Sequence, residues 1–395
     1  MTDDDPNTAF LRYKSRHSAT WTLVNLLRTD QHPCATRLGQ PLAGHEVVVC
    51  GAGASLADSL DELQTFGGPI LAVNKSAVVL RKHGIEPWAV IARESIDVSA
   101  QLDGTSLVAA DISAHPRVWE AAGDRLAWFL PGYPRHFGAC SLLGVVPTFG
   151  GTAAFTTAVH LARVWGASGI TLVGADLSLT PQDDGTFTSY HPDAPRGTLR
   201  AKKVGDRLHF SGGEDDDELC VDSGQPPQPK VVSYHELPSL RWGGLRPLLH
   251  THADEHYWLV TEASRHASTV RYRNATHDGI GIPGWEWVSA LPKGTPAAPP
   301  DMGHRVGEET HRALLDDLRA QADRLETVGD ELVNGPDLAR LATLDLWRGA
   351  PLIEMLAAGR QLDAPTEPRE RCIHAYRALG EAARETKAIM VGAGL

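Results

Sequence analysis

A glycine-rich segment, GAGASL, has the residue types that hold a phosphate group. It begins at Gly51, directly after the apolar run VVVC, and a helical pattern follows it. Glycine allows a close approach of the backbone, and the first turn of a helix offers free N–H groups and a positive dipole to an anion. Gly51, Gly53 and Ser55 are therefore candidate phosphate contacts. Ser55 could equally cap the helix, and the segment is neither GxGxxG nor a Walker A loop.

A second segment of this kind is FGGTAAF, in which Gly150, Gly151 and Thr152 precede a long apolar helix. The N-terminus of that helix is a second one that could face an anion. Thr152 could contact a ligand or cap the helix, and the sequence leaves both roles open.

Polar side chains also stand where apolar runs end. Asn74 ends PILAVN, Glu94 follows WAVIA, and Asp176 follows GITLVGA. Because open α/β sheets bind ligands outside the carboxyl ends of their strands, we expect these side chains at one crevice. His191, in the loop TSYHPD, is a candidate general base because histidine titrates near neutral pH. The alternatives are a helix cap for Asn74, an exposed salt bridge for Glu94 and an ordinary surface position for His191.

The elements that must position these residues alternate between strands and helices. Short apolar runs predict strands at 47–51, 69–74, 88–92, 106–110, 125–130 and 169–175. Helical patterns lie between them, among them TAAFTTAVHLARVWGA. Continuous apolar strands that alternate with helices predict an α/β fold, with a Rossmann-like, mostly parallel sheet and helices on both faces.

Composition divides the chain into a large domain and two flanking helical parts. We expect a helical lead-in over residues 1–43 and the Rossmann-like domain over 44–290. Within that domain, 181–230 is rich in glycine, aspartate and proline, which predicts a long loop excursion with one hairpin. PKGTPAAPPD indicates a linker over 291–303, and a C-terminal helical module is expected over 304–395.

The composition argues against several classes of protein. The formal charge is −12, from 49 acidic and 37 basic residues, whereas a nucleic-acid binder usually shows a basic excess. The five cysteines are odd in number and form no CxxC pair, which indicates buried thiols in a reducing compartment. No apolar run reaches roughly 18 residues and no N-terminal export signal is visible, so we expect no membrane span and a cytoplasmic location.

In order and spacing, these motifs resemble the 6-hydroxymethylpterin diphosphokinase MptE-like superfamily. They are particularly similar to its motility accessory factor branch, which modifies bacterial flagellins. The matching segments span about residues 44–290 and are, in chain order, GAGASL, ILAVNKSAVVL, HGIEPWAVIARES, FGGTAAFTTAVHLARVWGASGITLVGADL and NATHDGIGIPG.

The resemblance implies a nucleotide-dependent transferase. The activity it favours is glycosyl transfer, in which a nonulosonic-acid-like sugar passes from a nucleotide-sugar donor to a protein or glycan acceptor. The two glycine-rich segments and Asn74 would then hold the donor. Glu94 or His191 would be the general base, and Asp176 would orient the site. No separate cofactor or metal is expected for this reaction.

Two other functions stay open. One is ATP-dependent pyrophosphoryl transfer to a pterin-like alcohol, with Asp176 and Glu94 holding magnesium. The diphosphokinase branch carries a DLDG-like aspartate pair, and this sequence has ARES at that strand end, which weakens this alternative. Trp88 also stands where the family often has aspartate, so a polar contact is expected to be lost. The other is a catalytically silent nucleotide-binding or scaffold protein whose C-terminal helices bind a partner.

Overall fold

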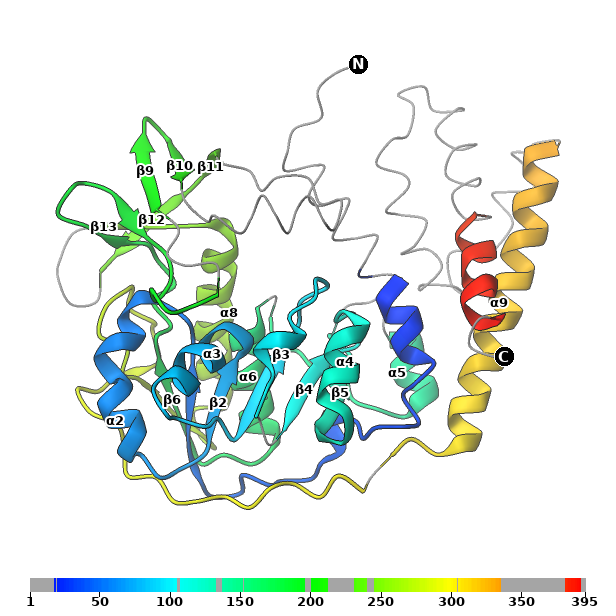
Figure 1. Cartoon of the computed structure of the whole chain (residues 1–395), viewed down its shortest axis with the longest axis horizontal. Coiled ribbons are helices and arrows are strands. Elements are labelled where there is room, and N and C mark those ends of the chain that lie inside the picture. The colour runs from blue at the N-terminus through cyan, green and yellow to red at the C-terminus, as the bar shows by residue number, and fades with distance from the viewer. Residues whose placement is uncertain are drawn as a thin grey trace.

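A parallel sheet forms the centre of the protein (Figure 1). The computed structural model describes residues 18, 20–104, 107–132, 137–151, 153–195, 200–211, 231–239, 245–303, 305–334 and 381–391. Within them, eight strands pair in parallel in the order β15-β14-β6-β1-β2-β3-β4-β5. They are β1 (Glu46–Cys50), β2 (Ile70–Val73), β3 (Ala89–Ala92), β4 (Val108–Asp111), β5 (Leu126–Phe129), β6 (Gly169–Val173), β14 (Arg271–Asn274) and β15 (Glu286–Trp287). The predicted strands and the α/β class are confirmed.

Helices cover both faces of this sheet because its strands are apolar on both sides. Along β1, Val48 and Cys50 face one core, and Val47 and Val49 face the other. The helices on the first face are α2 (Leu60–Thr65), α3 (Asn74–Lys82), α4 (Pro116–Ala122) and α5 (Phe137–Leu143). Those on the second face are α6 (Ala154–Val164) and α8 (His250–His266). Burial on both faces explains the continuous apolar runs in the sequence.

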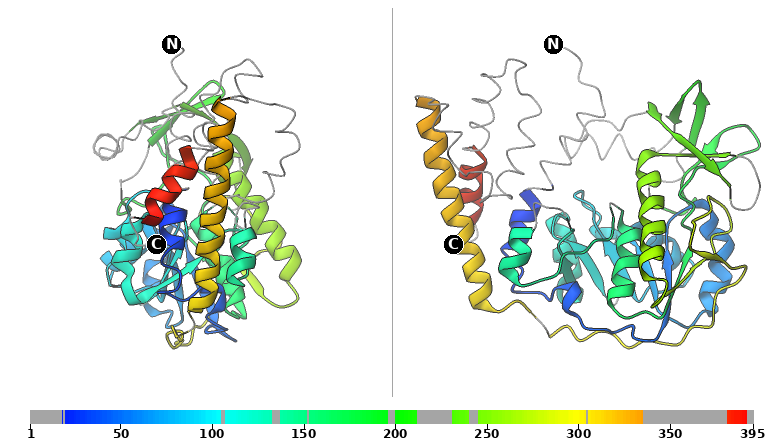
Figure 2. Two further views of the ribbon diagram at one scale, coloured as in Figure 1. Left: turned by 90° about the vertical axis from the view of Figure 1, so that its right-hand side faces the viewer. Right: turned by 180° about the vertical axis from the view of Figure 1, so that it is seen from behind.

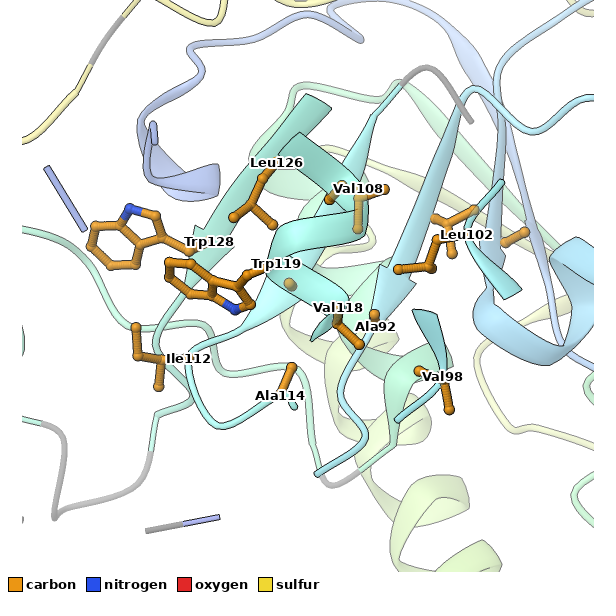
Figure 3. Close-up of a cluster of buried hydrophobic side chains, with 14 of the residues drawn as sticks. Ala92, Val98, Leu102, Val108, Ile112, Ala114, Val118, Trp119, Leu126 and Trp128 are labelled. Carbon is orange, nitrogen blue, oxygen red and sulfur yellow. The ribbon is translucent and has the colours of Figure 1, made fainter. Parts of the chain in front are cut away.

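The N-terminal segment is tied to the core by tryptophan side chains. Figure 3 shows Trp119 and Trp128 in the cluster that packs around α4. The Trp128 indole N–H donates to the His32 carbonyl at 2.9 Å, and the Trp165 indole N–H donates to the Ala35 carbonyl at 2.8 Å. The cysteines of the described residues are free and buried, as the sequence indicated, and they are Cys34, Cys50 and Cys140.

The strand order creates a switch point between β1 and β6. From β1 the sheet grows through β2 to β5 in one direction, and β6 then pairs with the other side of β1. Gly51 and Gly174 follow these two strands and lie against each other, because a Cβ on Gly51 would be 2.4 Å from the Gly174 carbonyl oxygen. Ligands of open α/β sheets bind at such a point, outside the carboxyl ends of the strands.

Two small antiparallel sheets follow β6, where the sequence predicts a long loop with one hairpin. The hairpin is β9–β10, and it belongs to a sheet of order β11-β10-β9-β8-β7, beside a β12–β13 pair. Runs of two or three residues carry no readable alternation, so the shortest strands escaped prediction. The strands are β7 (Thr180–Pro181), β8 (Phe187–Thr188), β9 (Arg200–Val204), β10 (Arg207–Ser211), β11 (Val231–Ser233), β12 (His235–Pro238) and β13 (Leu245–Leu248).

The segment 291–303 runs along the amino ends of the strands, as the yellow trace under the sheet in Figure 1 shows. The Leu291 N–H donates to Glu62 Oε2 at 2.8 Å, and the Trp88 indole N–H donates to the Ala298 carbonyl at 3.3 Å. Trp88 therefore lies at the end of β3 that is remote from the carboxyl edge. Its replacement of the family's aspartate does not alter the predicted crevice.

Helix α9 (Glu308–Asn334), the helix 381–391 and the N-terminal helix 20–26 lie together beside the β5 end of the sheet (Figures 1 and 2). Leu318 and Leu26 belong to one buried cluster. Residues 335–380 of the predicted C-terminal helical module fall outside the described residues, and the independence of the module stays a prediction. No helix in the described part of the chain is long and apolar enough to cross a membrane.

Candidate functional site

A cleft of about 520 Å³ opens at the carboxyl ends of β1, β2, β3, β4 and β6. The start of α6 and the first turns of α8 complete its wall. Of the residues that the sequence indicated, it is lined by Gly51, Gly53, Asn74, Glu94 and Asp176. Its other polar lining includes Lys75, Arg93, Asp111, Ser178, Ser189, Tyr190, His252 and Glu255.

Asp176 holds the glycine-rich loop in place. Its carboxylate accepts hydrogen bonds from the Ser55 N–H at 3.1 Å and from the Ser55 hydroxyl. Ser55 is 4% exposed, so it is committed to Asp176 and neither caps a helix nor lines the cleft. A Cβ on Gly53 would lie 2.6 Å from the Asp176 carboxyl carbon, so the loop needs glycine to pass this side chain. The turn after it, Ala54–Ser59, is a 3-10 helix rather than the expected α-helix.

The surroundings of Asp176 are unusual for an acid. Burial raises its pKa to about 7, although the hydrogen bonds from Ser55 act in the opposite direction. Leu177 has a φ of 53°, a left-handed conformation that few residues other than glycine adopt. The Ile280 N–H donates to the Asp176 carbonyl at 3.2 Å and helps to hold this backbone. Strained conformations of this kind cluster at functional sites.

Helix α3 brings its first turn to the cleft. The Asn74 side chain donates to Gln101 Oε1 at 2.8 Å, and the capping interaction of the helix is made by Ser76 instead. The Lys75 ammonium lies 3.9 Å from the centroid of the Tyr190 ring. A cation beside the free N–H groups of a nine-residue helix favours an anion at this position.

Arg93 is a cleft residue that the sequence pattern did not reveal. Its Nε donates to Asp111 Oδ2 at 3.1 Å, and its Nη1 donates to the Gly151 carbonyl at 2.8 Å and to the Thr157 hydroxyl at 2.9 Å. The side chains of Arg93 and Asp111 are 8% and 3% exposed. Both residues stand at the ends of apolar strands, and their pairing depends on β3 and β4 being neighbours. The pair fixes the segment before α6 to the sheet.

Helix α8 adds a further group that the sequence pattern did not reveal. Thr251, His252 and Glu255 from its first turns line the cleft. Burial raises the pKa of Glu255 to about 8 and lowers the pKa of His252 to about 4, so both are largely neutral at pH 7. The sequence signal that could have located this helix is the helical spacing of Leu259 and Ala263, which are both buried.

Three buried polar atoms in the cleft wall have no hydrogen-bond partner within the described residues. They are Ser178 Oγ, Ser189 Oγ and His252 Nδ1. Buried polar groups are nearly always paired, and an unpaired one destabilises a fold by roughly 1–3 kcal/mol. Their meeting in one cleft indicates a polar ligand. Because Glu255 and part of the Asp176 population are neutral at pH 7, the cleft also repels an anion less than its residue types suggest.

His191 belongs to a neighbouring cluster, while the adjacent Tyr190 lines the cleft. The His191 N–H donates to the Ala52 carbonyl at 3.0 Å, and its Nδ1 accepts from the Asp193 N–H at 3.0 Å. His83 Nε2 lies 3.2 Å from Asp193 Oδ2. Burial lowers the pKa of His191, which favours the neutral ring. The backbone N–H of His191, rather than its ring, supports the glycine-rich loop.

The second glycine-rich segment packs against α6. A Cβ on Gly150 would lie 2.4 Å from the Thr157 Cα, so this glycine serves close packing. Gly151, with a φ of 65°, lines a different cavity, and Thr152 falls outside the described residues. At the start of α6 the cleft is lined by residues 153–155.

Asp176, one of the two residues expected to hold magnesium in the alternative reaction, fits a magnesium site poorly. Magnesium prefers ionised carboxylate oxygens, whereas both Asp176 oxygens are engaged by Ser55 and burial favours the neutral acid. In the described part of the chain, the side chains that approach the spacing of a metal site are His83, His191 and Asp193, within 4.8 Å of one another. These stand outside the cleft lining, so no magnesium-dependent step is assigned to Asp176 and Glu94.

One protein family matches the chain over residues 22–182, and its description is 6-hydroxymethylpterin diphosphokinase MptE-like. Residues 22–182 are therefore similar to the MptE-like family. The resemblance seen in the motifs is thereby confirmed. The MptE-like part supplies β1 to β6 and, with them, Asn74, Arg93 and Asp176. Helix α8 and its Glu255 lie beyond it.

Among solved structures, the MAf glycosyltransferase from Magnetospirillum magneticum AMB-1 has a similar fold, with a TM-score of 0.58 and 13% sequence identity. The superposition covers 95% of this chain and 59% of that one, so this chain spans 59% of the neighbour's length. At this identity the likeness concerns the fold. No curated protein matches the sequence. The MptE-like description and the neighbour's name both refer to group-transfer enzymes.

Proposed function

We propose that the protein is a glycosyltransferase that binds a nucleotide-linked sugar in the cleft and transfers the sugar to a hydroxyl group of a protein or glycan acceptor. The sugar class suggested by the family resemblance is a nonulosonic acid. In the reaction, the acceptor oxygen bonds to the anomeric carbon, and the bond from that carbon to the donor phosphate oxygen breaks. The nucleotide leaves with the electron pair, and a base accepts the proton of the acceptor hydroxyl.

The unpaired polar atoms of the cleft carry this proposal. Ser178, Ser189 and His252 need partners, and a nucleotide sugar brings phosphate oxygens and many hydroxyl groups. The cleft lies at the switch point of the sheet, where nucleotides bind in folds of this class. Lys75 and the first turn of α3 suit the phosphate, and the protonated Glu255 can donate a hydrogen bond to it.

The roles of the remaining residues follow from their contacts. Gly51 and Gly53 bring the loop backbone close to the donor. Asp176 is a positioning residue that acts through Ser55. Glu94 lines the cleft and is the proposed base, and His191 supports the loop through the hydrogen bond from its backbone N–H to the Ala52 carbonyl.

A nucleotide-binding experiment tests the donor site. CMP, UDP, GDP and ATP are added with and without magnesium, and the melting temperature and the dissociation constant are measured. A nucleotide that binds the folded state raises the melting temperature. Lys75→Met should weaken nucleotide binding by about 10- to 100-fold, the usual effect of losing a hydrogen bond to a charged group.

Lys82→Met is the matched control, because Lys82 lies in the last turn of the same helix and pairs with Asp193 instead. It should bind nucleotide as the unmodified protein does. Failure of every nucleotide to bind would remove the donor site, and equal effects of the two variants would place it away from α3. Binding of ATP alone, and only with magnesium, would favour the pyrophosphokinase alternative.

Turnover measurements separate the two candidate bases. Glu94→Gln should lower turnover by about a hundredfold or more while nucleotide binding is kept, because a general base contributes on this scale. His191→Asn should have a smaller effect on turnover. The turnover rate of His191→Asn should still rise with pH, as that of the unmodified protein does. A loss of that pH dependence in His191→Asn, with Glu94→Gln still active, would reverse the assignment.

A further inference from the structure

A second cavity, of about 480 Å³, lies between α6 and α8 on the other side of the segment that Arg93 holds. The MptE-like motifs do not account for it, and the proposed donor cleft does not include it. Its wall contains Thr148, Phe149, Arg163, Trp258, Glu262 and Arg265. Its volume is in the range of small-molecule sites.

The aromatic part of the wall is held in a fixed position. The Trp258 indole N–H donates to the Phe149 carbonyl at 2.8 Å. Phe149 is 52% exposed, and its ring lies against the backbone of Gly132, where a Cβ would meet it at 2.4 Å. Exposed rings beside a cavity pack well against the flat, apolar face of a ligand.

In the charged part of the wall, Arg265 is a cation that forms no ion pair with another described residue. Arg163 Nε donates to Glu262 Oε1 at 2.6 Å, and its Nη2 lies 3.2 Å from His160 Nδ1. Burial lowers the pKa of His160 to about 3, so that ring is neutral and accepts from Arg163. Arg265 is exposed and has no ion-pair partner within the described residues. The cavity therefore complements a ligand with a single negative charge.

The wall also contains a hydroxyl group without a partner. Thr148 is 3% exposed, and within the described residues its Oγ1 has no hydrogen-bond partner. The backbone of Thr148 is paired on both sides, with the Leu130 carbonyl and the Gly132 N–H. A buried hydroxyl that its own fold leaves unpaired is best explained by a bound polar group.

We propose that this second cavity binds a sugar that carries one carboxylate. The ring of the sugar packs on Phe149, its hydroxyl groups bond to Thr148 and Glu262, and its carboxylate meets Arg265. A nucleotide fits less well, because its phosphate would bring additional negative charge next to Glu262. This site is separate from the donor cleft, so the proposal stands whether or not the cleft binds a nucleotide.

Glucuronate and glucose form a matched pair of probes, because they differ only in the carboxylate. Ligand-observed NMR on the full chain should show glucuronate binding at least tenfold more tightly than glucose. Arg265→Ala should weaken glucuronate binding by tenfold or more, the usual effect of losing a hydrogen bond to a charged group. Lys75→Met, which alters the other cleft, should leave glucuronate binding unchanged.

Thr148→Val distinguishes a ligand role from a structural role. Replacing an unpaired buried hydroxyl by a methyl group should leave the melting temperature equal or higher. The same variant should weaken glucuronate binding. Equal binding of glucose and glucuronate, full competition by inorganic phosphate, or unchanged glucuronate binding in both Arg265→Ala and Thr148→Val would each overturn the proposal.

Discussion

At the scale of single residues, burial determines the charge of two acids, Glu255 and Asp176. Both line the cleft, and burial raises the pKa of Glu255 to about 8 and that of Asp176 to about 7. The Asp176 oxygens accept hydrogen bonds from Ser55, whereas the Glu255 carboxyl group forms no hydrogen bond with another described residue. In the neutral form Glu255 can donate to a phosphate oxygen, which an ionised carboxylate cannot do.

The raised pKa of Glu255 predicts a pH-dependent contribution to stability. The folded protein keeps the proton up to about pH 8, whereas the unfolded chain releases it near 4.5, the ordinary pKa of a glutamate side chain. The contribution of the Glu255 proton to the free energy of unfolding is therefore complete below pH 4.5 and is lost as the pH rises through 8. Relative to Glu255→Gln, the unmodified protein should lose at most about 1.4 kcal/mol of unfolding free energy per pH unit in that window.

Urea unfolding at several pH values between 5 and 8 measures this difference. Asp61→Asn is a suitable control, because Asp61 is exposed in α2 and is not among the charges that shift the pKa of Glu255. The difference between the unmodified protein and Glu255→Gln should fall with pH. A difference that does not change between pH 5 and 8 would mean that Glu255 is ionised in the folded protein at neutral pH.

At the scale of elements, the segment 291–303 shows that a composition typical of a linker can still produce a packed structure. It has no helix or strand, yet Leu291, Thr295 and Ala298 contact the domain through hydrogen bonds. Gly294 packs directly on the backbone before β2, where a Cβ would lie 2.5 Å from the Gly68 nitrogen. Prolines limit the conformations of such a segment before it docks.

Gly294→Ala should therefore release this segment. The added Cβ meets backbone atoms that cannot move aside, so the segment should detach and become cleaved faster in limited proteolysis. Gly307→Ala is the matched control, because nothing lies within 4 Å of a Cβ at that position. Its cleavage rate should equal that of the unmodified protein. Equal cleavage of both variants would show that the contacts of Gly294 do not hold the segment.

At the scale of the whole molecule, the N-terminal helix 20–26 packs with α9 and the helix 381–391 beside the β5 end of the sheet (Figure 2). His311 Nε2 lies 3.1 Å from the Leu26 carbonyl oxygen, and Lys387 pairs with Asp323 at 2.7 Å. The buried face of α9 shares its apolar cluster with the sheet. These contacts favour cooperative unfolding of the described parts, whereas the linker composition predicts a separate module.

Leu318→Ala decides between these two outcomes. Leu318 is 2% exposed, and truncation of a buried leucine destabilises a fold by roughly 2–5 kcal/mol. If the C-terminal helices are integral, scanning calorimetry should show one transition that moves as a whole to lower temperature. Arg319→Ala, at the next and more exposed position, should leave it in place. A separate early transition that alone responds to Leu318→Ala would establish an independent module.

The sequence by itself was sufficient for the elements and for the edge at which the site lies. Apolar runs are local signals, so they located the strands from β1 to β6. Once those strands are parallel, the residues after them must meet at one edge, and Gly51, Asn74 and Asp176 do line one cleft. The sequence did not predict the shortest strands after β6, because runs of two or three residues are too short to show an alternation of apolar and polar side chains.

Only the tertiary structure decided which side chains act together. Ser55 and Asp176 are 121 positions apart in the chain, and nothing in either segment indicates that the carboxylate is taken up by the serine. Arg93 bonds to Asp111 because β3 and β4 are neighbours in the sheet. Glu255 lines the cleft because α8 packs there, and the apolar spacing of that helix predicts which face is buried but not what it packs against. Hydrogen bonds and pKa values depend on distance and burial. These quantities arise from packing between distant segments, which a local pattern does not contain.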